Sequence, residues 1–171
     1  MKASMKDIKK RCQEENKEMW ELAVEDEIKL TGISKEEIFE RLARTLEVMK
    51  DSAKLALDKE VVSVTGMSGG NAKLMHDYFL SEDTVLGPLA SSAMAMAFST
   101  SEVNASMGRI VAAPTAGSAG ILPASLMAMY DKYKYSDEKL IKALLTATEI
   151  GHVIADNATF SGAEGGCQAE C

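Results

Sequence analysis

Apolar residues between positions 38 and 57 recur every three or four positions, and this spacing limits the fold more than any other feature of the chain. The residues that form this stripe are Ile38, Leu42, Leu46, Met49, Ala53 and Leu57. Such spacing places the side chains on one face of an α-helix, whereas a strand repeats every two residues. Ser34 and Glu37 match the S-x-x-E capping box that opens helices. We therefore predict a helix that begins after Ser34 and buries one face over about five turns.

A second helix, richer in charge, is predicted over residues 4–30. The apolar positions that share its stripe are Ile8, Cys12, Met19 and Ala23. Gly32 follows, and glycine commonly ends a helix. Residues 1–60 are therefore predicted to form an N-terminal helical hairpin.

The second part of the chain, residues 61–171, is predicted to join further helices through glycine-rich loops. Its one convincing β-branched run is VVSVTG, at positions 61–66. The helices predicted here cover residues 72–80, 88–107, 122–132 and 136–155. The fold class predicted for residues 1–171 is all-α, as a single helical domain with glycine-rich loops.

Composition excludes several classes of protein. The 171 residues include 46% hydrophobic residues, and 19 basic against 26 acidic residues give a net charge of −7. A nucleic-acid binder is not expected, because no basic stripe is present to contact phosphates. Two uncharged stretches, 84–101 and 110–130, are too polar and too often broken by glycine and proline to predict a membrane span. Three cysteines and no apolar leader predict a cytoplasmic protein.

Three segments rich in glycine indicate a binding site for a small anion. They are GMSGG (66–70), PTAGSAG (114–120) and SGAEGGC (161–167). Glycine lets a ligand approach main-chain N–H groups closely, and successive amides next to a helix N-terminus attract anions. One such loop is equally well explained as a helix-to-helix turn, whereas three together favour a ligand.

Two other interpretations of these glycine-rich segments stay open at this point. GMSGG fits the G-x-S-x-G elbow of serine hydrolases with Ser68 as nucleophile, but that fold needs a multi-stranded sheet and His152 is only a distant base. The second alternative is a non-catalytic helical assembly module, in which the glycine-rich loops serve packing only. His76 is interpreted as a surface or packing residue.

Cys167 and Cys171 have C-x3-C spacing, and this pair is either accidental or part of an incomplete metal site. Two thiolates cannot complete a tetrahedral zinc site, and a four-iron cluster usually takes at least three protein ligands.

Three segments resemble the α-subunit of the iron–sulfur-dependent bacterial L-serine dehydratases. They are TGMSGGNAK (65–73), NASMGRIVAAPTAGSAGILPA (104–124) and SGAEGGCQAE (161–170), and the likeness covers essentially the whole chain. The resemblance implies an all-helical α-domain, a [4Fe–4S] cluster held by three cysteines, a β-chain partner and an oligomeric enzyme. Cys167 matches the first cluster ligand, whereas Cys171 stands where the family has a small apolar residue and is not counted as a ligand.

The resemblance also implies the reaction and the length of the complete chain. In the family, an open iron acts as a Lewis acid on the β-hydroxyl of L-serine, which yields pyruvate and ammonia. Loop chemistry and the matched motifs together assign the substrate carboxylate to Ser68, Gly69, Gly70, Thr115, Ala116 and Gly117. No general base is assigned. The other two cluster cysteines belong to a C-terminal stretch absent from this sequence, so the 171 residues are expected to be an inactive fragment on their own.

Overall fold

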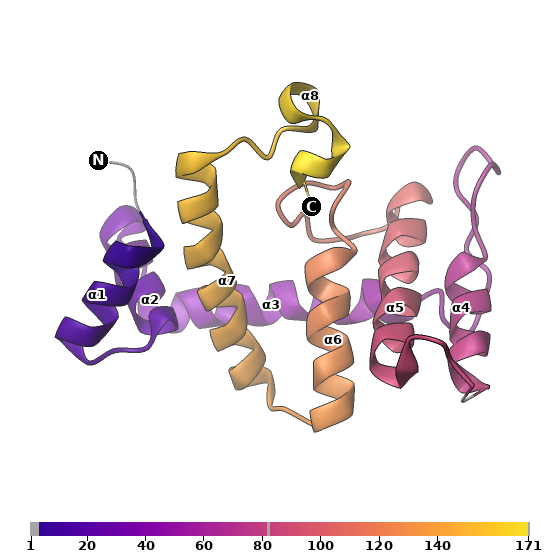
Figure 1. Ribbon diagram of the computed structural model, residues 1–171, viewed down its shortest axis with the longest axis horizontal. Helices are drawn as coiled ribbons and strands as arrows, with labels where there is room; N and C mark the ends of the chain where they lie inside the picture. The colour runs from indigo at the N-terminus through magenta and orange to yellow at the C-terminus, as the bar shows by residue number, and fades with distance from the viewer. Residues whose placement is uncertain (1–3, 82, 171) are drawn as a thin grey trace. The chain divides into compact units, whose positions relative to one another are not determined.

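The computed structural model describes residues 4–81 and 83–170 and is built almost entirely from helices (Figure 1). They are α1 (Met5–Glu15), α2 (Met19–Thr31), α3 (Lys35–Lys54), α4 (Asn71–Leu80), α5 (Gly87–Ala105), α6 (Ile121–Tyr133), α7 (Asp137–Asn157) and α8 (Gly162–Gly165), followed by a 3-10 turn, η1 (Cys167–Glu170). Within these residues the one strand-like pairing is an isolated antiparallel bridge between Val62 and Gly69. The prediction of an all-α chain is confirmed.

Contacts divide the chain into two compact units. The first combines Met1–Arg44 with Asp137–Ala169, and the second is mainly Thr45–Ser136. Helix α3 therefore contributes its first half to one unit and its second half to the other. None of the described helices is both long enough and apolar enough to cross a membrane.

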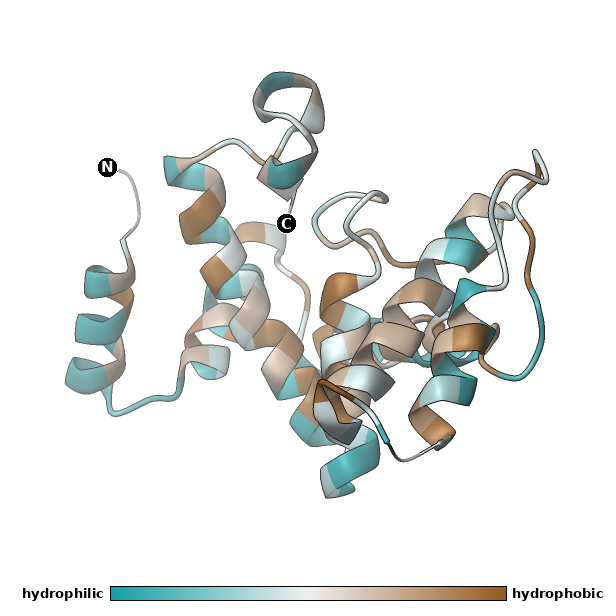
Figure 2. Cartoon of the chain, turned by 45° about the vertical axis from the view of Figure 1, so that its right-hand side comes forward, coloured by the Kyte–Doolittle hydropathy of each residue, from teal (hydrophilic) through white to brown (hydrophobic). Residues whose placement is uncertain are grey.

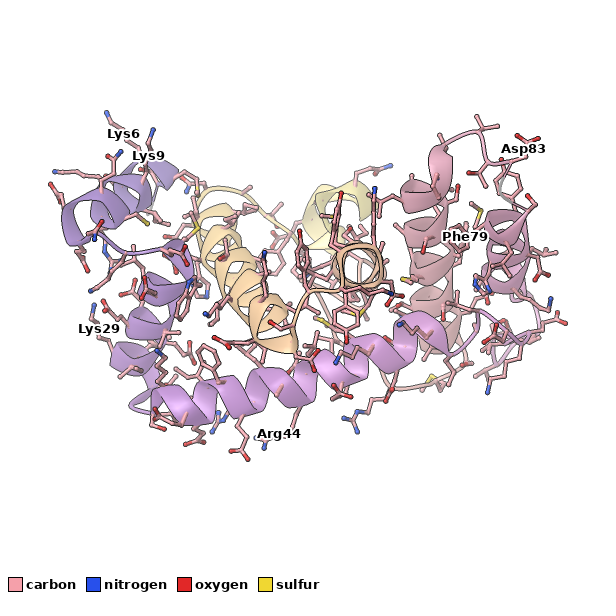
Figure 3. The ribbon with its side chains drawn as sticks, turned by 90° about the horizontal axis from the view of Figure 1, so that it is seen from below. Lys6, Lys9, Lys29, Arg44, Phe79 and Asp83 are labelled. Atoms are coloured by element: carbon pink, nitrogen blue, oxygen red, sulfur yellow. The ribbon has the colours of Figure 1, made fainter. Side chains whose placement is uncertain are left out.

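The first unit is organised around a small apolar core between α1, α2 and α7. Its buried members are Ile8, Leu22 and Val153, with Cys12 and Met19 packed against them. The opposite face of α1 is hydrophilic, as the teal helix near the N-terminus shows in Figure 2, and Lys6, Lys9 and Lys29 project outward in Figure 3. Burying one apolar stripe and hydrating the other face is what an amphipathic helix pair requires.

The prediction of one continuous helix over residues 4–30 is wrong. Asn16 adopts a left-handed conformation (φ 51°) and ends α1. Glu18 then caps α2 by accepting a hydrogen bond from the backbone of Glu21, whose own carboxylate accepts from the Glu18 amide at 2.9 Å. Asparagine tolerates this conformation better than most residues. Together the asparagine and the reciprocal glutamate cap give the chain a turn that hydrophobic spacing alone does not reveal.

Arg11 and Asp26 form a two-pronged ion pair in the first unit, with N···O distances of 2.6 and 3.0 Å. The hydrogen bond from Arg11 lowers the pKa of the Asp26 carboxyl. Glu149 on α7 is only 7% exposed, and burial together with the charge of Asp26 raises its pKa despite opposing effects of His152 and Arg11. The two carboxyls therefore affect stability in opposite directions as pH changes.

We expect Glu149→Gln to raise the Tm at pH 7 and to have little effect at pH 4. A carboxyl whose pKa is raised by folding stabilises the protein below its ordinary value of 4.5, and that contribution is lost as pH rises through the folded pKa. Glutamine does not ionise, so it avoids this loss. Thermal unfolding of both proteins at the two pH values measures the difference.

Asp26→Asn provides the opposite control for this prediction. The pKa of Asp26 is lowered from 3.8 on folding, so its contribution is present above that value and is lost as pH falls through the folded pKa. The substitution should lower the Tm at pH 7. A Glu149→Gln protein that is less stable than the wild type at pH 7 contradicts the assigned effect of burial.

The second unit places α5 between α4 and α6 (Figure 1). Helix α5 packs through small buried side chains, and Ser91, Ala95 and Ser99 lie in its interior face. The Ser99 hydroxyl donates to the carbonyl oxygen of Ser52 at 2.7 Å and accepts from the amide of Ala56 at 3.0 Å. Because these small residues let backbones approach closely, the end of α3 is hydrogen-bonded directly to α5.

Most of the predicted α3 stripe is buried. Ile38, Leu46, Met49, Ala53 and Leu57 are each less than a tenth exposed. The Ser34 hydroxyl accepts a hydrogen bond from the amide of Glu37 at 3.2 Å. This confirms the predicted start of the helix.

Candidate functional site

Two of the three glycine-rich segments lie at the same end of the second unit, where α4 and α6 begin and α5 ends (Figure 1). Residues 61–70, which we call the tongue, lead into α4. Residues 113–120, which we call the α6 loop, lead into α6. The N-termini of α4 and α6 carry partial positive charge and attract anions, whereas the C-terminus of α5 carries partial negative charge.

The tongue is a short turn held by its own backbone and by α5. The Ser63 amide donates to the Ser68 carbonyl at 2.8 Å, and the Ser68 amide donates to the Ser63 hydroxyl at 3.1 Å. At the tip, the Val64 amide donates to the carbonyl of Ala105, the last residue of α5, at 3.1 Å. The Ser68 side chain is exposed, and its hydroxyl has no partner among the described residues.

Gly69 has a backbone position that only glycine fits. Its φ is +148°, and a Cβ atom there would lie 2.4 Å from the Val61 carbonyl oxygen and 2.7 Å from the Val62 Cα. The tongue therefore depends on Gly69 for the close approach of its two arms. Gly70, which follows, is the N-cap residue of α4 and carries no side chain to cap it.

The α6 loop is organised by Ser118, which is 1% exposed. The Ser118 hydroxyl donates to the Ala113 carbonyl at 3.1 Å and lies 3.3 Å from the Thr115 hydroxyl. In return the Ser118 amide donates to Thr115 Oγ1 at 3.4 Å. The Thr115 hydroxyl thus has an internal partner as well as a position at the surface of the loop.

Ala116 and Gly117 form the exposed turn between Thr115 and Ser118. Their amides donate to no group among the described residues. The carbonyl of Ala116 accepts a hydrogen bond from the side-chain amide of Asn104 at 3.0 Å. Two successive unpaired amides in a fixed turn are suited to binding a carboxylate.

The C-terminal end of α5 holds both loops. Glu102 accepts hydrogen bonds from the first two amides of α4, Asn71 at 2.6 Å and Ala72 at 3.2 Å. Asn104 holds the α6 loop. It follows Glu102 by two positions on α5, and this separation corresponds to about 200° around a helix. The predicted substrate-binding residues of the tongue and of the α6 loop are therefore fixed to opposite sides of one helix end.

Sequence reasoning missed Glu102, Asn104 and Ser118. For Glu102 a signal exists, because it is the first charged residue after an uncharged stretch of α5. For Ser118 the signal is its position three residues after Thr115, a spacing at which hydroxyls bond to nearby backbone groups. Neither signal by itself identifies the partner.

The third glycine-rich segment belongs to the first unit. It forms the short helix α8 and leads into the turn η1, and Thr159, which precedes α8, donates a hydrogen bond to Glu164 of α8 at 2.8 Å. Cys167 is the first residue of η1. Its side chain, and Cys171, lie outside what the structure describes, so the prediction that Cys167 binds iron stays a prediction.

A complete ligand set for a metal cluster is not formed by the described residues. Among them no three His, Cys, Asp or Glu side chains gather closely enough to hold a metal ion. Cys12 is half-buried against the core of the first unit. These residues therefore do not fit a [4Fe–4S] cluster without further ligands.

The serine hydrolase alternative lacks its scaffold. A nucleophile elbow stands between a strand of a parallel sheet and a helix, and residues 4–81 and 83–170 contain an isolated bridge but no sheet. His76 Nδ1 lies 3.1 Å from the Leu57 carbonyl oxygen, and the ring stacks on Phe79. This supports the interpretation of His76 as a packing residue.

Known proteins match this chain over nearly its whole length. The family model described as serine dehydratase alpha chain matches residues 14–171. An L-serine dehydratase alpha chain of Peptoniphilus asaccharolyticus is 48% identical over 160 residues, which cover 94% of this chain and 55% of the relative. A probable L-serine dehydratase alpha chain of Bacillus subtilis (strain 168) is 42% identical over 150 residues, covering 88% of this chain and 50% of the relative.

A third relative, L-serine dehydratase 2 of Escherichia coli (strain K12), is 35% identical over 174 residues, which cover 98% of this chain and 38% of the relative. The chain thus spans about half the length of the two alpha chains that it matches. No solved structure matches the chain significantly.

Proposed function

Because this chain belongs to the serine dehydratase alpha chain family, we propose that it carries the substrate-binding part of an L-serine dehydratase. The reaction converts L-serine into pyruvate and ammonia. The observation that carries the proposal is the position of the tongue and the α6 loop, which are fixed to the same end of α5 at the N-termini of α4 and α6. In this proposal the two loops, fixed to opposite sides of this helix end, contact a small amino acid from two directions.

The proposed contacts with the substrate use polar groups of the two loops that are exposed to solvent. The free amides of Ala116 and Gly117, next to the Thr115 hydroxyl, bind the substrate carboxylate. The exposed Ser68 hydroxyl contributes a hydrogen bond from the tongue. Gly69 and Gly70 contribute backbone shape, because they let the chain turn sharply into α4.

Orienting the substrate is the chemical task of these residues. Loss of water from serine requires the α-proton and the β-hydroxyl to leave from adjacent carbons. A carboxylate held by fixed amides limits rotation of the substrate and presents both carbons in one orientation, which lowers the entropic cost of the step. The base that takes the α-proton is not assigned to any described residue.

The cofactor and the partners in this proposal extend beyond the chain. Cys167 supplies one thiolate to a [4Fe–4S] cluster, and the other ligands are not found as a group among the described residues. A β-chain completes the enzyme, which works as a cytoplasmic oligomer. The 171 residues are then the N-terminal part of the catalytic α-domain.

We expect Ser68→Ala and Thr115→Ala to lower kcat/KM for L-serine by roughly 10- to 100-fold in the complete enzyme. Each substitution removes one hydrogen bond to a charged group, worth about 1.5–3 kcal/mol. Iron content should not change, since neither hydroxyl is a cluster ligand. Pyruvate formation and iron content are measured on the same preparations.

Ser125→Ala and Thr115→Ser are the matched controls. Ser125 is an exposed serine of α6 whose hydroxyl donates to its own helix at Ile121, 2.8 Å away, so its loss should leave kcat/KM unchanged. Thr115→Ser keeps the hydroxyl and should retain most activity. Full kcat/KM in both Ser68→Ala and Thr115→Ala would contradict the proposed site and favour a helical assembly module.

A further inference from the structure

The N-terminus of α4 already holds an anion that belongs to the protein. Glu102 comes from α5, is 6% exposed, and accepts the amides of Asn71 and Ala72 with one carboxylate oxygen, Oε1. The N-cap residue of α4 is Gly70, which has no side chain for this purpose. A carboxylate 31 residues away in sequence therefore takes the place of a local cap.

The second oxygen of the same carboxylate is buried without a partner. Among the described residues, Glu102 Oε2 accepts no hydrogen bond and has almost no exposed surface. Leaving such an oxygen unpaired costs free energy, as does burying the charge. Two amide donors and the positive end of α4 offset that cost at Oε1. The carboxylate thus lies at a position where an apolar residue would avoid the penalty.

The internal carboxylate changes which groups a substrate can use. A glycine-rich turn before a helix usually offers its first amides to an anionic ligand. In α4 those amides are bonded to Glu102, and a second carboxylate beside it would be repelled. In the α6 loop the amides of Ala116 and Gly117 are exposed and unpaired among the described residues.

We propose that Glu102 is a positioning residue that seals the start of α4 and fixes the end of the tongue, so that the substrate carboxylate binds at Ala116–Gly117 instead. The assignment of the substrate carboxylate rests on the proposed dehydratase function, whereas the role of Glu102 in fixing the tongue does not. Glu102 holds the base of the tongue at Asn71, and Ala105 holds its tip at Val64. Ser68 is carried between these two anchors, so its position depends on both.

Hydrogen exchange of the 171-residue chain tests the positioning role without any activity. We expect Glu102→Leu to speed exchange of the Asn71 and Ala72 amides by roughly 10- to 100-fold, because each loses a bond to a charged acceptor. Glu102→Gln should give a smaller increase, since its carbonyl oxygen still accepts. If the leucine protein does not fold, the glutamine protein provides the measurement.

The matched controls are Glu149→Leu and Glu149→Gln. Glu149 is a glutamate of similar burial in the first unit, 7% exposed. These changes should leave exchange at Asn71 and Ala72 as in the wild type. Unchanged exchange in the Glu102 variants, or equal acceleration in both sets, overturns the positioning role.

Binding of the substrate carboxylate at the α6 loop is tested by adding L-serine to the complete enzyme. We expect L-serine to slow exchange at Ala116 and Gly117 and to leave Asn71 and Ala72 unchanged. Protection at Asn71 and Ala72 overturns the assignment of the carboxylate to the α6 loop. Protection at neither pair overturns that assignment and the proposed function together, while the positioning role is decided separately by the exchange of the isolated chain.

Kinetics of the complete enzyme separate a positioning residue from one that touches the substrate. With the carboxylate bound at the α6 loop, Glu102→Gln should lower kcat by roughly tenfold and change KM little, because binding is preserved while orientation is loosened. A large rise in KM with unchanged kcat overturns the positioning role, since it indicates a direct contact between Glu102 and the substrate.

Discussion

Replacing Cys167 with serine in the complete enzyme is expected to abolish both iron retention and pyruvate formation. Under the proposed function this cysteine supplies one of a small number of thiolates to the cluster. A serine hydroxyl is a hard ligand that stays protonated near neutral pH, whereas iron–sulfur clusters are held by soft thiolates. Loss of one ligand should therefore remove the cluster, and dehydration should fall to background. Iron content, the visible absorption spectrum and pyruvate formation are measured on the same preparation.

Cys12→Ser is the matched control for this prediction. Cys12 is a half-buried cysteine of α1 that packs against the core formed by Ile8, Leu22 and Val153. Its replacement should cost some stability but leave iron and activity intact. If Cys167→Ser retains full iron and activity, Cys167 is not a ligand. Loss of iron in Cys12→Ser but not in Cys167→Ser would show that the cluster ligand is Cys12 of α1 and that the assignment to Cys167 is wrong.

The features that the sequence predicted well are those fixed by neighbours in the chain. The stripe from Ile38 to Leu57 is buried because helix geometry brings every third or fourth residue to one face. Ser34 begins α3 through a bond to an amide three residues away. In each case the physical cause lies within one or two helical turns, so pattern and structure agree.

The break at Asn16 was missed although its cause is also local. The stripe of Ile8, Cys12, Met19 and Ala23 runs through the break with helical spacing. Hydrophobic spacing reports which residues are buried together and does not report whether the helix between them is continuous. The competing information was in the caps, where a left-handed asparagine and a Glu18–Glu21 pair outweigh helix propensity.

The candidate site could be predicted only in part, because its organising residues act over long distances in sequence. Glycine and hydroxyl residues in the two loops indicated that each loop had an unusual backbone. That Glu102 and Asn104 tie both loops to the end of α5 depends on tertiary packing. A buried carboxylate on a helix of small residues looks, in sequence, like the end of an apolar stretch. Only the structure shows that its partner is the backbone of α4.

The second large effect is expected for Gly69→Ala, which should open the tongue. The added Cβ would lie 2.4 Å from the Val61 carbonyl oxygen and 2.7 Å from the Val62 Cα, and both are backbone atoms that cannot turn aside. Its φ of +148° adds conformational strain of about 1–3 kcal/mol for a residue with a side chain. The two arms should therefore separate, and the Ser63 amide should lose its bond to the Ser68 carbonyl. Hydrogen exchange at Ser63 in the 171-residue chain measures the opening.

Gly66→Ala distinguishes the steric effect from the loss of glycine as such. Gly66 lies in the same tongue at φ +72°, and a Cβ there would meet no atom within 4 Å. The change should lower the stability of the protein by only about 1–2 kcal/mol, the cost of a left-handed conformation for alanine, and should leave the Val62–Gly69 bridge in place. In the complete enzyme Gly69→Ala should lower kcat/KM at least as much as Ser68→Ala, because it displaces Ser68 and the start of α4 together. Equal effects of the two glycine substitutions on exchange at Ser63 would show that the close approach of the arms does not hold the tongue.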